Sequence, residues 1–312
     1  MAITDRSFIL GQGRTGVLLV HGLGGTPIEF KLVAKGLARN GFKVYCCQLA
    51  GHCGSTEDLI KTKWEDWYAS VEESFEVLRK DCDTIVVGGL SMGAVLALHL
   101  AAKRPDEVHG LALYAPTLWY DGWAMPWYRF MLSLGMKTPF GRWIVRRFYN
   151  FVETEPYGIK DPTIRAVVVA AMQSGDSTLA GVLTTPGEAV IELYRLANVV
   201  KKELPQIDAP AFIVQAREDD LSSLRNTEYL QRHLGGLVDT LILDDSYHIV
   251  TVDRQRDLLI EGTVAFGMLL AGRMRMQEHS NEIVRPLSDA AKPAENAARS
   301  GPNAKGHTQG NT

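Results

Sequence analysis

The sequence has no long apolar run, and its charges nearly balance. Its 312 residues carry a net charge of −3, which gives no general attraction for nucleic acid or an anionic membrane. No window approaches the roughly 18 apolar residues of a membrane span. The first residues lack the basic segment and apolar run of a signal peptide. We therefore expect a cytoplasmic protein with no nucleic-acid partner and no stable membrane insertion.

Cysteine is also scarce and is confined to the first third of the chain, at Cys46, Cys47, Cys53 and Cys82. No two of these form a C-x-x-C pair, so the sequence predicts neither a disulfide framework nor a zinc site. The glycine-rich segment after residue 20 lacks the spacing of nucleotide-binding loops. No metal or cofactor is predicted, and a nucleotide-binding α/β protein is an alternative that thermal shift with nucleotides would test.

What is present is an alternation of short apolar runs with helix-length segments. The runs are continuous, which is typical of strands covered on both faces. They fall at residues 16–20, 43–47, 84–87, 108–114, 211–215 and 240–243. Helix-length stretches follow the first three runs, at 28–40, 63–80 and 91–104. This alternation predicts an α/β fold with a doubly wound, mostly parallel sheet.

The alternation stops between residues 116 and 210. Separate amphipathic helices are indicated near 126–135, 141–152, 162–173 and 186–202. We therefore predict a helical cap at 116–210, inserted into a core formed by 1–115 and 211–275.

The end of the chain, residues 276–312, is rich in Ser, Asn, Ala, Pro and Gly. Such a segment buries too little apolar surface to offset the entropy lost on ordering, so we predict a disordered tail. A last helix is expected before it, near 253–271.

The most informative motif is Gly-Leu-Ser-Met-Gly at residues 89–93, directly after an apolar run. On a sharp strand-to-helix turn, G-x-S-x-G pushes the serine hydroxyl into an open site. The alternative is a plain Gly/Ser-rich turn, but the strand before and the helix after it favour a nucleophile at Ser91. The N–H of Met92 then lies at a helix start, where it can help to hold an oxyanion.

A serine nucleophile needs a base, and the base needs an orienting acid. Asp219 follows an apolar run, at the strand end where sites of open α/β sheets lie. A solvated acidic loop is the alternative there, and Asp220 is the second candidate for the acid. His248 follows the last apolar run and is the predicted base; the other downstream histidine before the tail, His233, lies in a helix-like segment.

The segment 21–27, His-Gly-Leu-Gly-Gly-Thr-Pro, follows the first apolar run. Its glycines allow a sharp turn that presents backbone N–H groups to a small volume. We predict an oxyanion hole made by the N–H groups of Leu23 and Met92, and a structural role for His21.

Taken in order, these motifs, with Gly51-His52-Cys53 and Ser246-Tyr247-His248, resemble the α/β-hydrolase superfamily, most nearly bacterial carboxylesterases and monoacylglycerol lipases. The resemblance covers roughly residues 14–271. It implies an α/β-hydrolase fold with an eight-stranded, mostly parallel sheet, helices on both faces and a helical cap after the sixth strand.

By the same resemblance, Ser91 is the nucleophile, Asp219 the acid and His248 the base, with Leu23 and Met92 as oxyanion donors. Cys53, Ala94 and Tyr247 stand where the family often has glycine, and none of these departures removes a catalytic group.

The aromatic-rich segment at the start of the cap suggests the substrate. Large apolar side chains there pack in the core or line an acyl pocket, for which the candidates are Trp119, Trp123 and Met125. Transient lipid contact is a third possibility, helped by Arg142, Arg146 and Arg147. The expected partner is a small acyl ester; the sequence does not fix the oligomeric state.

The same triad also serves thioesters, lactones and amides, because acyl-transfer chemistry is shared. A substrate panel separates these reactions. From another class, the chain could be a non-catalytic, hydrolase-like binding protein, which would not react with a serine-directed phosphonate at Ser91.

Overall fold

The computed structural model describes residues 3–125 and 138–290. The chain forms two compact units, Met1–Ala271 and Gly272–Thr312. The last helix, α11 (Arg256–Ala290), ends in the second unit. It continues over residues 276–290, where we predicted disorder, because Arg, Met, Gln and Glu in this stretch favour a helix. The rest of the predicted tail, 291–312, lies outside the described residues.

The first unit is organised by one sheet, whose described strands are seven in number and run in the order β1-β3-β2-β4-β5-β8-β9. Their bounds are β1 (Phe8–Leu10), β2 (Thr15–Val20), β3 (Phe42–Cys47), β4 (Thr84–Leu90), β5 (Gly110–Tyr114), β8 (Ala211–Ala216) and β9 (Val238–Leu243). Every neighbouring pair is parallel except β1 with β3. The predicted α/β class and mostly parallel sheet are confirmed.

Two details of the implied sheet need correction. The described residues give seven strands rather than eight, and the inserted segment follows β5, the fifth strand along the chain. The edge strand β1 was not predicted, because three half-exposed residues give no periodic signal.

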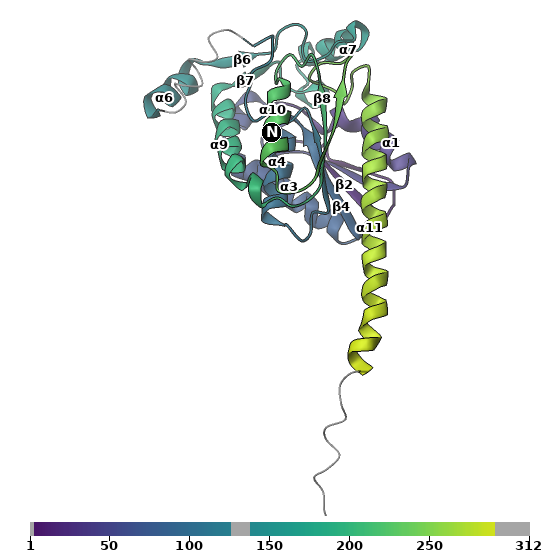
Figure 1. Ribbon diagram of the computed structural model, residues 1–312. Coiled ribbons are helices and arrows are strands. Elements are labelled where there is room, and N and C mark those ends of the chain that lie inside the picture. Colours follow the sequence, from purple (N-terminus) through teal and green to yellow (C-terminus); the bar gives the residue numbers. More distant parts are fainter. Residues whose placement is uncertain (1–2, 126–137, 291–312) are drawn as a thin grey trace, which may run out of the picture. The chain divides into compact units, whose positions relative to one another are not determined.

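Helices cover both faces of the sheet. Alternate residues of β2 point to opposite faces, so Leu18 and Val20 belong to one hydrophobic cluster while Val17 and Leu19 belong to the other. The first cluster includes buried residues of α3 (Trp64–Arg79), α4 (Met92–Lys103), α9 (Gly187–Glu203) and α10 (Leu224–His233). The second includes α1 (Lys31–Arg39) and the first turns of α11. Figure 1 shows α3, α4 and α9 across the sheet from α1.

The segment between β5 and β8 carries α6 (Pro139–Phe148), β6 (Asn150–Val152), α7 (Pro162–Gln173), α8 (Ser177–Ala180), β7 (Thr184–Pro186) and α9. Strands β6 and β7 pair in a small antiparallel sheet that the sequence did not predict. Helix α9 packs on α3 and α4 and so joins the layer that covers the main sheet. The helix predicted near 126–135 lies outside the described residues.

Three short elements complete the described chain: η1 (Pro27–Phe30), α2 (Thr56–Ile60) and η2 (Leu204–Gln206). Across residues 3–125 and 138–290, no helix has both the length and the apolarity needed to cross a membrane.

Candidate active site

Ser91 lies on a tight turn between β4 and α4. Its backbone has φ 56° and ψ −114°, in the left-handed half of conformational space that non-glycine residues seldom adopt. A Cβ at Gly89 would lie 2.3 Å from the Val20 carbonyl oxygen, and one at Gly93 only 1.9 Å from it. The turn therefore packs so closely against β2 that both flanking positions require glycine.

Asp219 and His248 meet in the loops that follow β8 and β9. The Nδ1 atom of His248 lies 3.0 Å from Oδ1 and 2.9 Å from Oδ2 of Asp219. The carboxylate also accepts hydrogen bonds from the Leu221 and Ser222 N–H groups and from Gln215 Nε2. These donors fix the carboxylate, which in turn fixes the plane of the imidazole.

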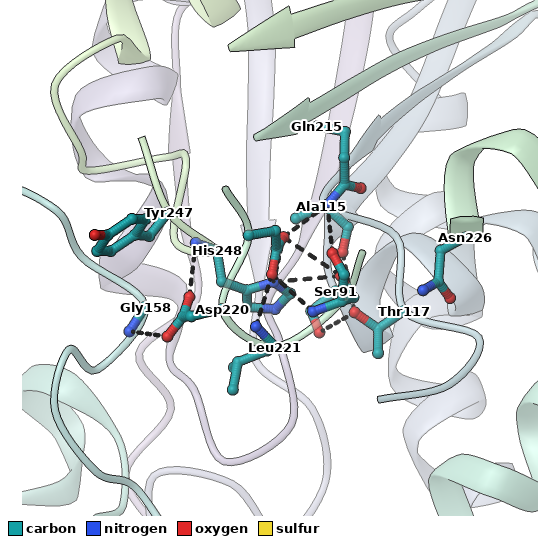
Figure 2. A network of polar contacts seen from close by, with 12 residues as sticks. Ser91, Ala115, Thr117, Gly158, Gln215, Asp220, Leu221, Asn226, Tyr247 and His248 are labelled. Carbon is teal, nitrogen blue, oxygen red and sulfur yellow. Dashed lines mark hydrogen bonds and ion pairs between the residues drawn. The ribbon is translucent and has the colours of Figure 1, made fainter. Parts of the chain in front are cut away.

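Asp220, the second candidate, has different partners. Its carboxylate accepts hydrogen bonds from the backbone N–H groups of Gly158, at 3.0 Å, and of His248, at 3.2 Å. Figure 2 shows Asp220 between Gly158 and His248. The two adjacent acids therefore have different partners: Asp219 orients the imidazole ring, and Asp220 positions the backbone of the loop that carries His248, the histidine loop.

The charges around His248 stabilise its protonated form. Burial is the largest single effect and opposes protonation, but the carboxylates of Asp219, Asp220 and Glu153 outweigh it, and the pKa of His248 is raised. Because its pKa is raised, the imidazole of His248 accepts a proton readily, and its contact with Asp219 keeps its orientation fixed.

The Ser91 hydroxyl is bonded to Thr117, a residue that sequence reasoning missed. Ser91 Oγ donates to Thr117 Oγ1 at 3.0 Å, and Thr117 Oγ1 donates to the Ala115 carbonyl at 3.1 Å. Figure 2 shows this contact. Thr117 follows β5, which is the neighbour of β4, and no feature of the sequence signals that adjacency.

The glycine-rich loop after β2 lies at the same edge of the sheet. His21 is buried and bonded on both ring nitrogens: Nδ1 lies 2.9 Å from the Gly22 carbonyl, and Nε2 accepts from the Leu49 N–H. Burial lowers the pKa of His21 far below its ordinary value, so the ring stays neutral and supports the loop through its two hydrogen bonds. The N–H of Leu23 is free of hydrogen bonds to any described residue, and Met92 opens α4, whose first N–H groups have no helical partner.

A cavity of about 180 Å³ joins these groups. Ser91, His248 and Leu23 all line it, while Met92 is fully buried beside Ser91. Its apolar wall comes largely from the inserted segment and includes Phe151, Val168, Met172, Leu179 and Val182.

Two carboxyls also line the cavity, those of Glu29 and Glu153, and no motif in the sequence signals either of them. Glu29 accepts a hydrogen bond from the Gly22 N–H at 3.0 Å. Burial raises the pKa of Glu29 to about 8 and that of Glu153 to about 7.

The three predicted substrate-binding residues are not brought to the cavity. Trp119 packs edge-on against Tyr229, with Lys201 Nζ 4.8 Å from its ring centre. Trp123 is 59% exposed and donates to the Glu218 carbonyl, and Met125 is buried. Aromatic density in the sequence did not reveal which side of this segment faces the cavity. Of the three basic residues named for lipid contact, Arg146 and Arg147 are exposed on α6 and Arg142 is half-buried.

The chain is similar in sequence and in fold to known proteins. The chain is 29% identical over 266 residues to a thermostable monoacylglycerol lipase of Bacillus sp. (strain H-257), covering 85% of this chain and 95% of the relative. It is 25% identical over 269 residues to a carboxylesterase of Bacillus subtilis (strain 168), covering 85% and 96%. A solved structure from work on the metagenome-derived lipolytic enzymes LipS and LipT matches with a TM-score of 0.69 at 25% identity, covering 84% of this chain and 96% of that one.

These similarities confirm the predicted α/β-hydrolase fold and the resemblance to bacterial carboxylesterases and monoacylglycerol lipases. The family model described as serine aminopeptidase, S33, matches residues 11–255, which is well over half of the chain. The protein therefore belongs to the serine aminopeptidase S33 family.

Proposed function

We propose that the protein hydrolyses carboxylic esters of apolar acyl groups through an acyl-enzyme intermediate formed on Ser91. The observation that carries the proposal is that Ser91 and His248 line one cavity while Asp219 holds the His248 ring, the three residues coming from loops that follow β4, β9 and β8. The relatives that are a monoacylglycerol lipase and a carboxylesterase support an ester as the substrate.

In this proposal His248 is the general base. Asp219 holds the proton on Nδ1, so Nε2 is free to accept the proton of Ser91. Ser91 must first exchange its hydrogen bond to Thr117 for one to His248, by rotation of its side chain. Its oxygen then attacks the ester carbonyl, the alcohol leaves with a proton from His248, and water repeats the sequence to release the acid.

The N–H groups of Leu23 and Met92 are the proposed oxyanion donors. Leu23 belongs to a loop that Glu29 and His21 brace at Gly22, and Met92 is held by the start of α4. Loss of one such donor costs about 10²–10³ in turnover in enzymes of this kind.

The apolar wall of the cavity favours an apolar acyl group, because burial of each methylene contributes about 0.8 kcal/mol. The proposed site of action is the cytoplasm, on a small-molecule ester. Four free, buried cysteines support a reducing compartment.

The test uses p-nitrophenyl esters of increasing chain length, together with a thioester, a lactone and an aminoacyl p-nitroanilide. We expect the ester series to be cleaved fastest, and Ser91→Ala to lose turnover and labelling by a fluorophosphonate while remaining folded. Ser246→Ala, which removes a serine near the site, is the control that should still label. A Ser91→Ala protein that retained turnover would refute the nucleophile, and preference for the anilide would refute the ester.

A further inference from the structure

The cavity contains two carboxyls that ester hydrolysis does not require. Glu29 lies in η1, just after the glycine-rich loop, and Glu153 directly follows β6. Both side chains line the same cavity as Ser91 and His248, although they come from opposite parts of the chain. Their position beside the reacting groups suggests a role in recognising substrate.

Among the described residues that line the cavity, the side chain that can carry a positive charge is His248, which is already bonded to Asp219. None of these lining residues is a lysine or an arginine. The Glu153 side chain is half-buried, and no described residue donates a hydrogen bond to its carboxyl. Glu29 has the single donor at Gly22. Burial raises the pKa of both groups even though the charge on His248 opposes this effect, and a bound cation would oppose it further.

The surrounding side chains suit an organic cation. Tyr120 and Phe151 stack with their ring centres 6.0 Å apart, and both line the cavity together with Tyr157. Aromatic faces attract ammonium groups, most strongly where water is excluded. A metal ion fits less well, because the described residues hold no group of three or more His, Cys, Asp or Glu side chains that could bind one.

The two carboxyls line the same cavity as His248, the proposed proton donor to the departing alcohol. The charge on His248 acts on both Glu29 and Glu153, so both lie within electrostatic reach of that imidazole. In the proposed reaction His248 hands its proton to the departing alcohol. The leaving group therefore departs beside the two carboxyls.

We propose that Glu29 and Glu153 form a cation subsite that selects esters whose alcohol portion carries an ammonium group. This inference rests on the proposed ester hydrolysis. The subsite stabilises the cation through two carboxylates and the adjacent aromatic rings, while the acyl group occupies the apolar wall.

The experiment compares butyrylcholine with 3,3-dimethylbutyl butyrate, which has the same shape but no charge. The readout is the ratio of kcat/KM for the charged ester to that for the neutral ester. We expect a ratio of about tenfold or more in the native protein. It should increase between about pH 6 and about pH 9, as Glu29 and Glu153 ionise. The other titratable groups lining the cavity are His248, Tyr120 and Tyr157. Loss of the His248 proton removes a positive charge that repels the charged ester alone, so the part of the pH dependence that the Gln variants remove is the part that belongs to the carboxyls.

The variants are Glu29→Gln and Glu153→Gln, which keep shape and remove charge. Each should lower the ratio severalfold and flatten its dependence on pH. Glu155→Gln is the matched control, because Glu155 is exposed and pairs with Arg165 away from the cavity. A variant that folded poorly would lose both esters together and leave the ratio unchanged.

Calorimetry on the Ser91→Ala protein separates this subsite from the reaction. Choline that binds about tenfold more tightly than 3,3-dimethylbutan-1-ol supports the subsite, even if no ester is cleaved and the proposed function fails. Equal binding of the two alcohols, or a kcat/KM ratio near one that neither Gln variant changes, overturns the subsite even if Ser91 cleaves both esters.

Discussion

Replacing Asp219 with asparagine should nearly abolish activity while the fold persists. Oδ1 of Asp219 accepts from two backbone N–H groups, those of Leu221 and Ser222. These groups can only donate, so an asparagine must place its amide oxygen there. Its NH₂ group then takes the position of Oδ2, which faces His248 Nδ1 at 2.9 Å and Gln215 Nε2 at 2.6 Å, so the Gln215 amide must turn away to avoid a second donor.

That donor would oppose the proton on Nδ1 and favour the tautomer with the proton on Nε2. Nε2 is the atom that must accept the proton of Ser91, so His248 can no longer act as the general base. A wrong tautomer in a serine–histidine–aspartate triad lowers kcat by about 10⁴, which corresponds to about 5 kcal/mol in the activation barrier. The assay is the pre-steady-state burst of p-nitrophenol, whose rate reports acylation of Ser91.

Asp220→Asn is the matched control, since it makes the same chemical change one residue away. Among the described residues, the Asp220 carboxylate accepts hydrogen bonds from the backbone N–H groups of Gly158 and His248 and not from the imidazole ring, so its replacement leaves the imidazole tautomer unchanged. We expect a loss of stability of about 1–3 kcal/mol in chemical denaturation and a fall in kcat of less than about a hundredfold. The reasoning is refuted if Asp219→Asn stays within tenfold of the native rate, or if Asp220→Asn is the more severe change.

Two further predictions concern Thr117 and Glu29. Thr117→Val removes the acceptor that holds the Ser91 hydroxyl away from His248, so kcat/KM should rise about two- to tenfold. Thr117→Ser keeps the acceptor and serves as control, and a fall in kcat/KM for the valine variant would show that the hydroxyl assists the reaction. For Glu29 the pKa is raised from 4.5 to about 8 in the folded state, so the unfolded chain ionises first and stability is lost as pH rises through this window. Glu29→Gln should therefore be more stable than the native protein at about pH 9, by at most about 5 kcal/mol, and no more stable below about pH 4.5; equal stabilities in denaturant titrations at the higher pH would contradict this.

The arrangement of the proposed triad could be anticipated because parallel strands bring their carboxyl ends to one edge. Ser91, Asp219 and His248 each follow an apolar run, and the observed strands β4, β8 and β9 end just before them. Residue chemistry alone did not separate Asp219 from Asp220, and it was the family resemblance that favoured Asp219. Adjacent residues of a loop face different partners, and only the folded loop shows which carboxylate meets the ring.

The cavity wall was harder to predict than the triad. The sequence drew attention to Trp119, Trp123 and Met125 after β5, yet of the described residues in that stretch it is Tyr120 that lines the cavity, and the apolar wall comes largely from β6, α7 and α8. Strand β6 has three residues, too few for a periodic pattern. Thr117 and Glu153 gave no signal either, because their importance depends on contacts between segments distant in the chain.

One departure from the family pattern has a local explanation. Cys53 occupies a backbone conformation with φ 61°, in the region that favours glycine, which is the residue the family often has there. Burial raises the pKa of its thiol to about 12, so Cys53 is held as a neutral thiol rather than a reactive thiolate.

The inserted segment is bonded to both sides of the proposed site. The Val182 N–H donates to the Gly24 carbonyl, at 2.9 Å, in the loop that carries the proposed oxyanion donor. On the other side, the Ile249 N–H donates to the Gly158 carbonyl at 2.7 Å, next to His248. A movement of this segment that broke these bonds would therefore disturb the oxyanion loop and the histidine loop together. Because the same segment supplies the apolar wall and Glu153, selection of the substrate and alignment of the reacting groups depend on one set of backbone contacts.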